Sequence, residues 1–197
     1  MYGTDIDRTL QKAKAAAAGT NVFVMENETV LIEGVRFVAG TLWTDFKLFG
    51  DPEAAMRAAG AQMNDYRLIR TDGHARPLHP TDTLARHRIT RAYIGSELAR
   101  AFAGPTVVVT HHGPYRAAMR HGHEHDIISA AYVSDLSSLI ERYQPDVWIY
   151  GHTHQSDDTM IGRTRIVSNS KGYGPHPALR LTTLENPTFD PTFVIEV

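Results

Sequence analysis

Two short apolar runs, each followed at once by histidines, constrain this chain of 197 residues more than any other feature. Residues 107–109 are apolar and belong to a strand, 106–109, that leads into Thr110-His111-His112-Gly113-Pro114. Residues 147–149 are likewise apolar, and their strand, 147–150, leads into Gly151-His152-Thr153-His154. Continuous apolar runs of this length are typical of strands that are covered on both faces. A helical stretch is predicted between them, over residues 129–143. Strand, helical crossover and strand together indicate a parallel α/β unit.

The rest of the chain supplies further helices and strands around this unit. Glu33-Gly34 separates two runs rich in Val, Ile and Phe, which predicts a β-hairpin. Asp51-Pro52 and Gly60 mark the start and the end of a short helix. We expect helices over 5–18, with Thr4 able to cap it, and over 81–103, and strands over 28–32, 35–43, 163–168 and 192–197.

The histidines fall where an α/β protein places its ligands, at the carboxyl ends of parallel strands. The chain has 11 histidines, and seven of them lie between His111 and His154. On an extended backbone alternate side chains share a face, so His152 and His154 are expected to point the same way. Neutral imidazole suits Zn, Fe, Ni and Mn better than Ca or Mg. We therefore predict that His111, His152 and His154 are metal ligands.

Other histidines have several possible roles. His112 can support a ligand, contact substrate or only pack in the interior, and the sequence leaves these three open. The tract from His121 to Asp126 resembles a metal-binding sequence, but a solvated loop is the preferred interpretation and a role at the rim of a cleft is the second. We interpret four scattered histidines as structural or solvent-exposed: His74, His79, His87 and His176. The pair Asp157-Asp158 is interpreted as a solvated turn rather than a pair of ligands.

Composition narrows the class of protein. The formal net charge is −2, so charge gives no indication of nucleic-acid binding. The chain has no cysteine, which excludes disulfides and thiolate metal sites. No apolar run approaches the ~20 residues of a membrane helix, and no secretory signal is evident. We expect one domain over residues 1–197 and a cytoplasmic location.

The ordered motifs resemble the calcineurin-like metallophosphoesterase superfamily. THHGP and GHTH follow apolar strands, and the segments at 40–46, 63–67, 168–173 and 185–194 also look like one branch of that superfamily. The resemblance implies an α/β fold with a β-sandwich flanked by helices, and hydrolysis of phosphomonoesters or phosphodiesters at two divalent metal ions. Candidate ions are Mn, Fe, Zn and Ni. His111 and His152 would bind one ion and His154 the other, with His112 as the catalytic residue.

This sequence departs from the family pattern upstream. The Asp-x-His, Gly-Asp-x-x-Asp and Gly-Asn-His-Glu motifs of family members, which supply carboxylate ligands, do not occur in it. We therefore expect a partial fold that lacks its N-terminal strands, and no more than trace activity from the chain as given. The alternatives are a non-catalytic domain of the same type that binds a partner or a single metal ion, and a fragment that folds only with a complementary chain.

Overall fold

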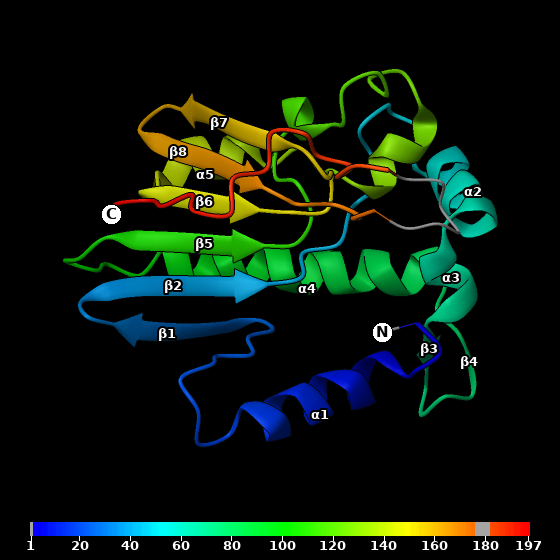
Figure 1. Ribbon diagram of the computed structural model, residues 1–197, viewed down its shortest axis with the longest axis horizontal. Coiled ribbons are helices and arrows are strands. Elements are labelled where there is room, and N and C mark those ends of the chain that lie inside the picture. The colour runs from blue at the N-terminus through cyan, green and yellow to red at the C-terminus, as the bar shows by residue number, and fades with distance from the viewer. Residues whose placement is uncertain (1, 176–181) are drawn as a thin grey trace.

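The computed structural model describes residues 2–175 and 182–197. Its main sheet has six strands in the order β1-β2-β5-β6-β8-β7 (Figure 1). The four inner strands run parallel, and the two edge strands are antiparallel to their neighbours. The strands are β1 (Glu28–Ile32), β2 (Val35–Gly40), β5 (Thr106–Thr110), β6 (Val147–Tyr150), β7 (Ser156–Ile161) and β8 (Thr164–Asn169), and a separate pair is formed by β3 (Arg70–Thr71) and β4 (Arg76–Pro77).

Helices flank this sheet, which confirms the predicted α/β class. Figure 1 shows α4 and α5 on one face, while the C-terminal segment runs across the other. The described residues form one large sheet, and they place no second large sheet of a sandwich against it. The helices are α1 (Ile6–Ala17), α2 (Pro52–Gln62), α3 (Asn64–Leu68), α4 (Pro80–Leu98) and α5 (Ser137–Tyr143), with short 3-10 turns η1 (Arg116–Ala118) and η2 (Ile127–Ala131).

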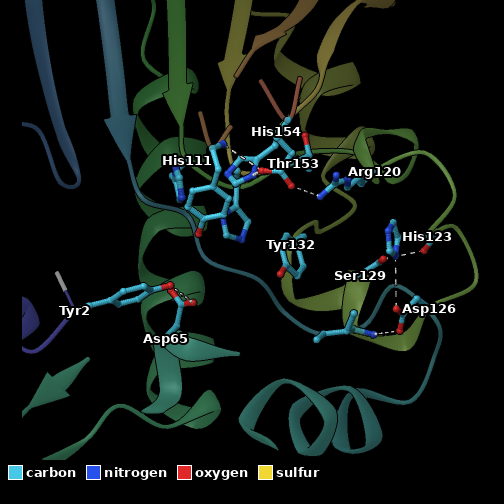
Figure 2. A pocket seen from close by; sticks show the side chains of 14 residues that line it. Tyr2, Asp65, His111, Arg120, His123, Asp126, Ser129, Tyr132, Thr153 and His154 are labelled. Atoms are coloured by element: carbon cyan, nitrogen blue, oxygen red, sulfur yellow. Dashed lines mark hydrogen bonds and ion pairs between the residues drawn. The ribbon is translucent and has the colours of Figure 1, made fainter. Parts of the chain in front are cut away.

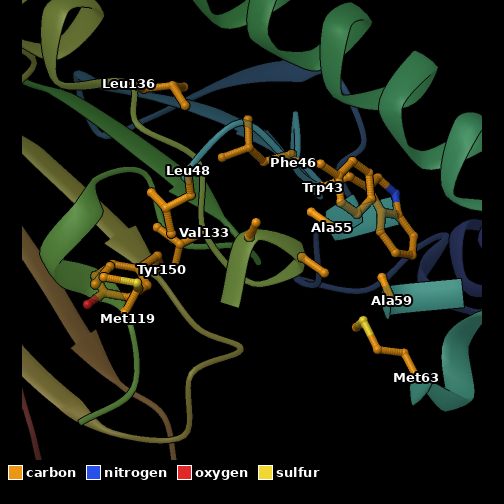
Figure 3. Close-up of a cluster of buried hydrophobic side chains, with 14 of the residues drawn as sticks. Trp43, Phe46, Leu48, Ala55, Ala59, Met63, Met119, Val133, Leu136 and Tyr150 are labelled. Atoms are coloured by element: carbon orange, nitrogen blue, oxygen red, sulfur yellow. The ribbon is translucent and has the colours of Figure 1, made fainter. Parts of the chain in front are cut away.

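Side chains along the inner strands alternate between the two faces of the sheet and form an apolar layer on each face. Val108, Trp148 and Ile166 are fully buried and belong to the larger cluster, which also holds residues of the helices and loops (Figure 3). Val107, at the next position along β5, faces the other way and joins a smaller cluster. Successive side chains of a strand point to opposite faces, so both faces of these strands carry apolar residues. This is why the inner strands read as unbroken apolar runs.

Local signals predicted several element boundaries. The hairpin with its turn at Glu33-Gly34 is confirmed by the antiparallel pairing of β1 and β2. Asp51 accepts a hydrogen bond from the Ala54 N–H at 2.9 Å and caps α2 as expected. The first helix is also confirmed, but its cap is Asp5 rather than Thr4, because the Asp5 carboxylate accepts from two N–H groups of the first turn.

Three expectations were wrong in part. The helix predicted over 129–143 is divided into η2 and α5, because Gly113 pairs with the intervening backbone around Val133. Residues 192–197 form no strand. Asp157-Asp158 is not a turn but lies in β7, where the Asp158 carboxylate binds Arg165 of β8.

No helix among the described residues is long and apolar enough to cross a membrane.

The packing of the sheet generates a stability prediction. Ile166 of β8 is fully buried in the larger apolar cluster, and replacing it with Ala should lower the free energy of unfolding by about 2–5 kcal/mol because a cavity remains. Met160→Ala on the neighbouring strand β7 is the control, because Met160 is 56% exposed and should change stability by less than ~0.5 kcal/mol. Denaturant unfolding measures both, and equal effects would contradict this assignment of the core.

Candidate metal-binding site

The parallel pairing of β5 and β6 brings the two histidine motifs together. Val109 lies opposite Ile149 in this pairing, and the Gly151 N–H donates to the His111 carbonyl at 3.0 Å just beyond the strand ends. The ring centroids of His111 and His152 are 4.7 Å apart, and those of His112 and His152 are 4.3 Å apart. The convergence that the sequence suggested is therefore present, and His112 belongs to it.

His112 is buried in a fixed orientation. Its Nδ1 lies 3.0 Å from the carbonyl oxygen of Thr41, which can only accept, so Nδ1 carries the proton. Its Nε2 is buried and has no hydrogen-bond partner. Burial first, and then the neighbouring His111, lower the pKa of His112 to about 3. The ring is therefore neutral near pH 7 and presents a free lone pair, which is the state in which histidine binds metals.

His152 presents a second unpartnered nitrogen. Its Nε2 is also buried without a hydrogen-bond partner, and its ring stacks on Tyr132 with centroids 4.5 Å apart. Burial, followed by the nearby His112, lowers the pKa of His152 well below its usual value. The extended backbone expected for His152 and His154 is wrong, since both have a positive φ, 69° and 54°. They turn out of β6 in a loop and still line one cavity.

His154 contacts Glu185, a residue that the sequence did not indicate as part of the site. Its Nδ1 lies 2.8 Å from Oε2 of Glu185, which also binds Nη1 of Arg120 through Oε1 at 2.6 Å. Burial would raise the pKa of Glu185, but hydrogen bonds from the Tyr173 N–H, Arg120 and His154 outweigh it and lower this pKa. The carboxylate is therefore ionised near neutral pH.

A cavity of about 360 Å³ connects these side chains. His111, His152 and His154 all line it, so the three predicted ligands face a common space. Figure 2 shows Tyr2 and Asp65 on another side of this cavity. The Tyr2 hydroxyl donates to Asp65 at 3.3 Å. His111 is exposed, unlike the buried His112, and this places it toward solvent.

The histidine-rich loop, residues 121–126, reaches the same cavity on the side opposite Tyr2 and Asp65. His123 and Asp126 line the cavity, and these two side chains approach each other to 3.7 Å (Figure 2). All residues from His121 to Asp126 are exposed, so this tract is a solvated loop, and two of its residues, His123 and Asp126, also form part of the cavity rim.

The scattered histidines have structural positions. His79 accepts from the Thr81 N–H and caps α4. His87 is buried near the Trp43 carbonyl, and His74 is exposed. His176 lies outside the described residues.

The donor atoms fit a metal ion only in part. His112 and His152 supply neutral, buried nitrogens that nothing else occupies, which suits a divalent transition metal. However, within residues 2–175 and 182–197 no group of three or more His, Cys, Asp or Glu side chains is arranged to hold a metal. The described imidazoles therefore provide part of a ligand set and do not complete one.

The fold and these strand-end histidines define an α/β protein with a nitrogen-rich cavity. The sequence pattern of calcineurin-like phosphoesterases matches residues 34–156, and the chain belongs to that family. An uncharacterized protein of Acanthamoeba polyphaga mimivirus is 26% identical over 163 residues. That alignment covers 78% of this chain and 55% of the viral protein, so the chain spans about half the length of this relative.

Solved structures show the same fold. The phosphopantetheinyl hydrolase of Mycobacterium tuberculosis superposes with a TM-score of 0.51 at 20% identity, covering 86% of this chain and 62% of that protein. Another solved structure also gives a TM-score of 0.51, at 15% identity, and covers 84% of this chain and 52% of its own. At these identities the likeness concerns the fold alone.

The burial of His112 generates a prediction about pH. The unfolded chain binds a proton at this histidine below about pH 6.5, whereas the folded chain does not until about pH 3, so acidification favours unfolding. In the presence of a chelator, the free energy of unfolding of the wild type should decrease as the pH is lowered from about 6.5 to about 3. His112→Asn should reduce the slope of this decrease by about 1.4 kcal/mol per pH unit. Urea unfolding at several pH values measures the slopes. Identical slopes would contradict a buried, neutral His112.

Proposed function

We propose that this chain carries part of the active site of a metal-dependent phosphoesterase that hydrolyses phosphomonoesters or phosphodiesters. The observation that carries the proposal is the pair of buried Nε2 atoms, on His112 and His152, that have no hydrogen-bond partner. Leaving such an atom unpaired costs about 1–3 kcal/mol, and a bound metal ion would remove that cost. Family membership supplies the reaction class.

The geometry favours His112, in place of His111, as the metal ligand from the first histidine motif. The Thr41 carbonyl fixes the Nδ1 proton of His112, and a metal-ligating histidine usually donates its other ring N–H in this way. We therefore propose His112, His152 and His154 as ligands. His111, the ligand first expected from this motif, instead lies exposed at the cavity, where it can contact a substrate phosphate.

The metal and the protein would divide the chemistry between them. Divalent ions such as Mn, Fe, Zn or Ni, two of them in the full centre that we propose, would act as Lewis acids toward phosphate oxygens. The buried rings keep neutral nitrogen donors in place, and Tyr132 holds the His152 ring by stacking. Two cations close together repel strongly in a buried site, so a two-ion centre needs carboxylate ligands in addition to these imidazoles.

One observation favours a second candidate, a non-catalytic domain of the same family that binds a partner or a single metal ion. The described residues contain no complete metal-binding group, and the unpartnered nitrogens of His112 and His152 would serve at most one ion. The two candidates differ in turnover and agree on the histidines.

Metal titration tests the shared part. We expect residues 1–197 to bind Zn²⁺ or Mn²⁺ in calorimetry. His152→Ala removes a nitrogen donor, so it should weaken binding by at least the roughly 10- to 100-fold that loss of a residue supporting a ligand costs. His125→Ala is the matched control, because His125 is exposed on the loop outside the cavity, and its affinity should equal that of the wild type. Unchanged affinity in His152→Ala would refute the site.

Turnover then separates the two candidates. Because the chain as given is expected to show no more than trace activity, hydrolysis of bis-p-nitrophenyl phosphate or p-nitrophenyl phosphate is measured with added Mn²⁺ in a longer form that carries the family's upstream carboxylate motifs, with its histidines intact and in both variants. Turnover that is lost only in His152→Ala supports the phosphoesterase. Metal binding without turnover supports the non-catalytic domain.

A further inference from the structure

Glu185 lies far from both histidine motifs in the sequence and next to His154 in the structure. Its side chain is only 14% exposed, and Oε2 is 2.8 Å from Nδ1 of His154. We infer that Glu185 is a positioning residue, which holds the His154 ring as its Nδ1–H tautomer and leaves the Nε2 lone pair for a metal ion. The inference rests on the proposed function for the role of that lone pair.

The chemistry of the contact fixes the direction of the hydrogen bond. An ionised carboxylate has no proton to give, so the atom of His154 that faces it must be the donor. A neutral imidazole has one N–H, and with Nδ1 protonated its Nε2 can only accept or bind a metal. His154 lines the cavity, and its side chain is 27% exposed.

Several contacts keep the Glu185 carboxylate in place. The Tyr173 N–H donates to Oε2 at 3.1 Å, and Arg120 pairs with Oε1 at 2.6 Å. The backbone is also paired, since the Glu185 N–H donates to the Tyr173 carbonyl at 2.9 Å. Both carboxylate oxygens therefore have partners other than His154, and the group is oriented before a metal arrives.

The neighbouring chain is built to allow this close approach. Gly172 has a φ of 68°, and a Cβ there would lie 2.9 Å from Cβ of His154 and 3.1 Å from Cβ of Glu185. Asn186, which follows Glu185, is 1% exposed and donates to the Ser170 carbonyl at 2.8 Å. The segment is therefore fixed to the end of β8, and the glycine leaves room for the pair.

The tautomer of His154 in the metal-free chain tests the inference directly. Two-bond ¹H–¹⁵N correlation spectra distinguish the two tautomers, and His154→Gln identifies the signals by their loss. We expect the Nδ1–H form in the wild type and a shift toward the Nε2–H form in Glu185→Ala. Glu53→Ala, which removes an exposed carboxylate on α2, is the control and should leave the tautomer unchanged.

The conservative variant separates positioning from folding. Glu185→Gln keeps an oxygen that can accept from Nδ1 but loses the ion pair, so it should retain more of the Nδ1–H form than Glu185→Ala does. If Glu185→Ala does not fold, the spectra of the wild type and Glu185→Gln decide. An Nε2–H tautomer in the wild type, or an unchanged tautomer in a folded Glu185→Ala, would overturn the inference.

Metal affinity supplies a second measurement, and it distinguishes failure of the proposed function from failure of the positioning role. Loss of such a supporting carboxylate should weaken Zn²⁺ binding about 10- to 100-fold, with the same control. If the wild type binds no metal, the proposed function fails while the tautomer still reports on Glu185. If the wild type binds Zn²⁺ and Glu185→Ala binds it equally well, the positioning role is wrong.

Discussion

The pairing of β5 with β6 is the interaction on which the candidate site depends. The two strands run parallel, and both histidine motifs begin within a few residues of their carboxyl ends. A hydrogen bond from the Gly151 N–H to the His111 carbonyl continues the contact beyond the strands. Because both strands are buried on two faces, their register is strongly constrained by packing. The position of the imidazoles therefore follows from the core of the sheet.

This arrangement is unfavourable for the stability of the fold alone. Two buried imidazole nitrogens lack partners, and burial disfavours the charged form of both rings. An unsatisfied buried polar atom costs free energy that an apolar side chain of similar shape would avoid. A cluster of this kind is consistent with a site whose remaining partner is a ligand. That reasoning supports the metal proposal independently of the family to which the chain belongs.

Local sequence predicted the parts of the structure that depend on local chemistry. The apolar runs of β5 and β6 and the capping residue Asp51 are signals within a few residues. The division of the helix predicted over 129–143 depends instead on Gly113, which binds this backbone from a distant position. The strand β7 was missed because its aspartates are polar. Its Asp157 accepts hydrogen bonds from Tyr115 and Tyr150, which the spacing of residues cannot reveal.

The same distinction applies within the site. That His111, His152 and His154 face a common cavity was predictable, because histidines after buried strands form a recognisable pattern, whereas a single glutamate in a polar segment does not. Glu185 acquires its position from Tyr173, Arg120 and the buried Asn186, all of which are brought together only by the fold. The cavity therefore has a wall fixed by hydrogen bonds around Glu185 and, on the other side, an exposed rim that includes His123 and Asp126. A change in the exposed rim would leave His154 in place, whereas a change in the wall would also disturb it, because Glu185 contacts its Nδ1.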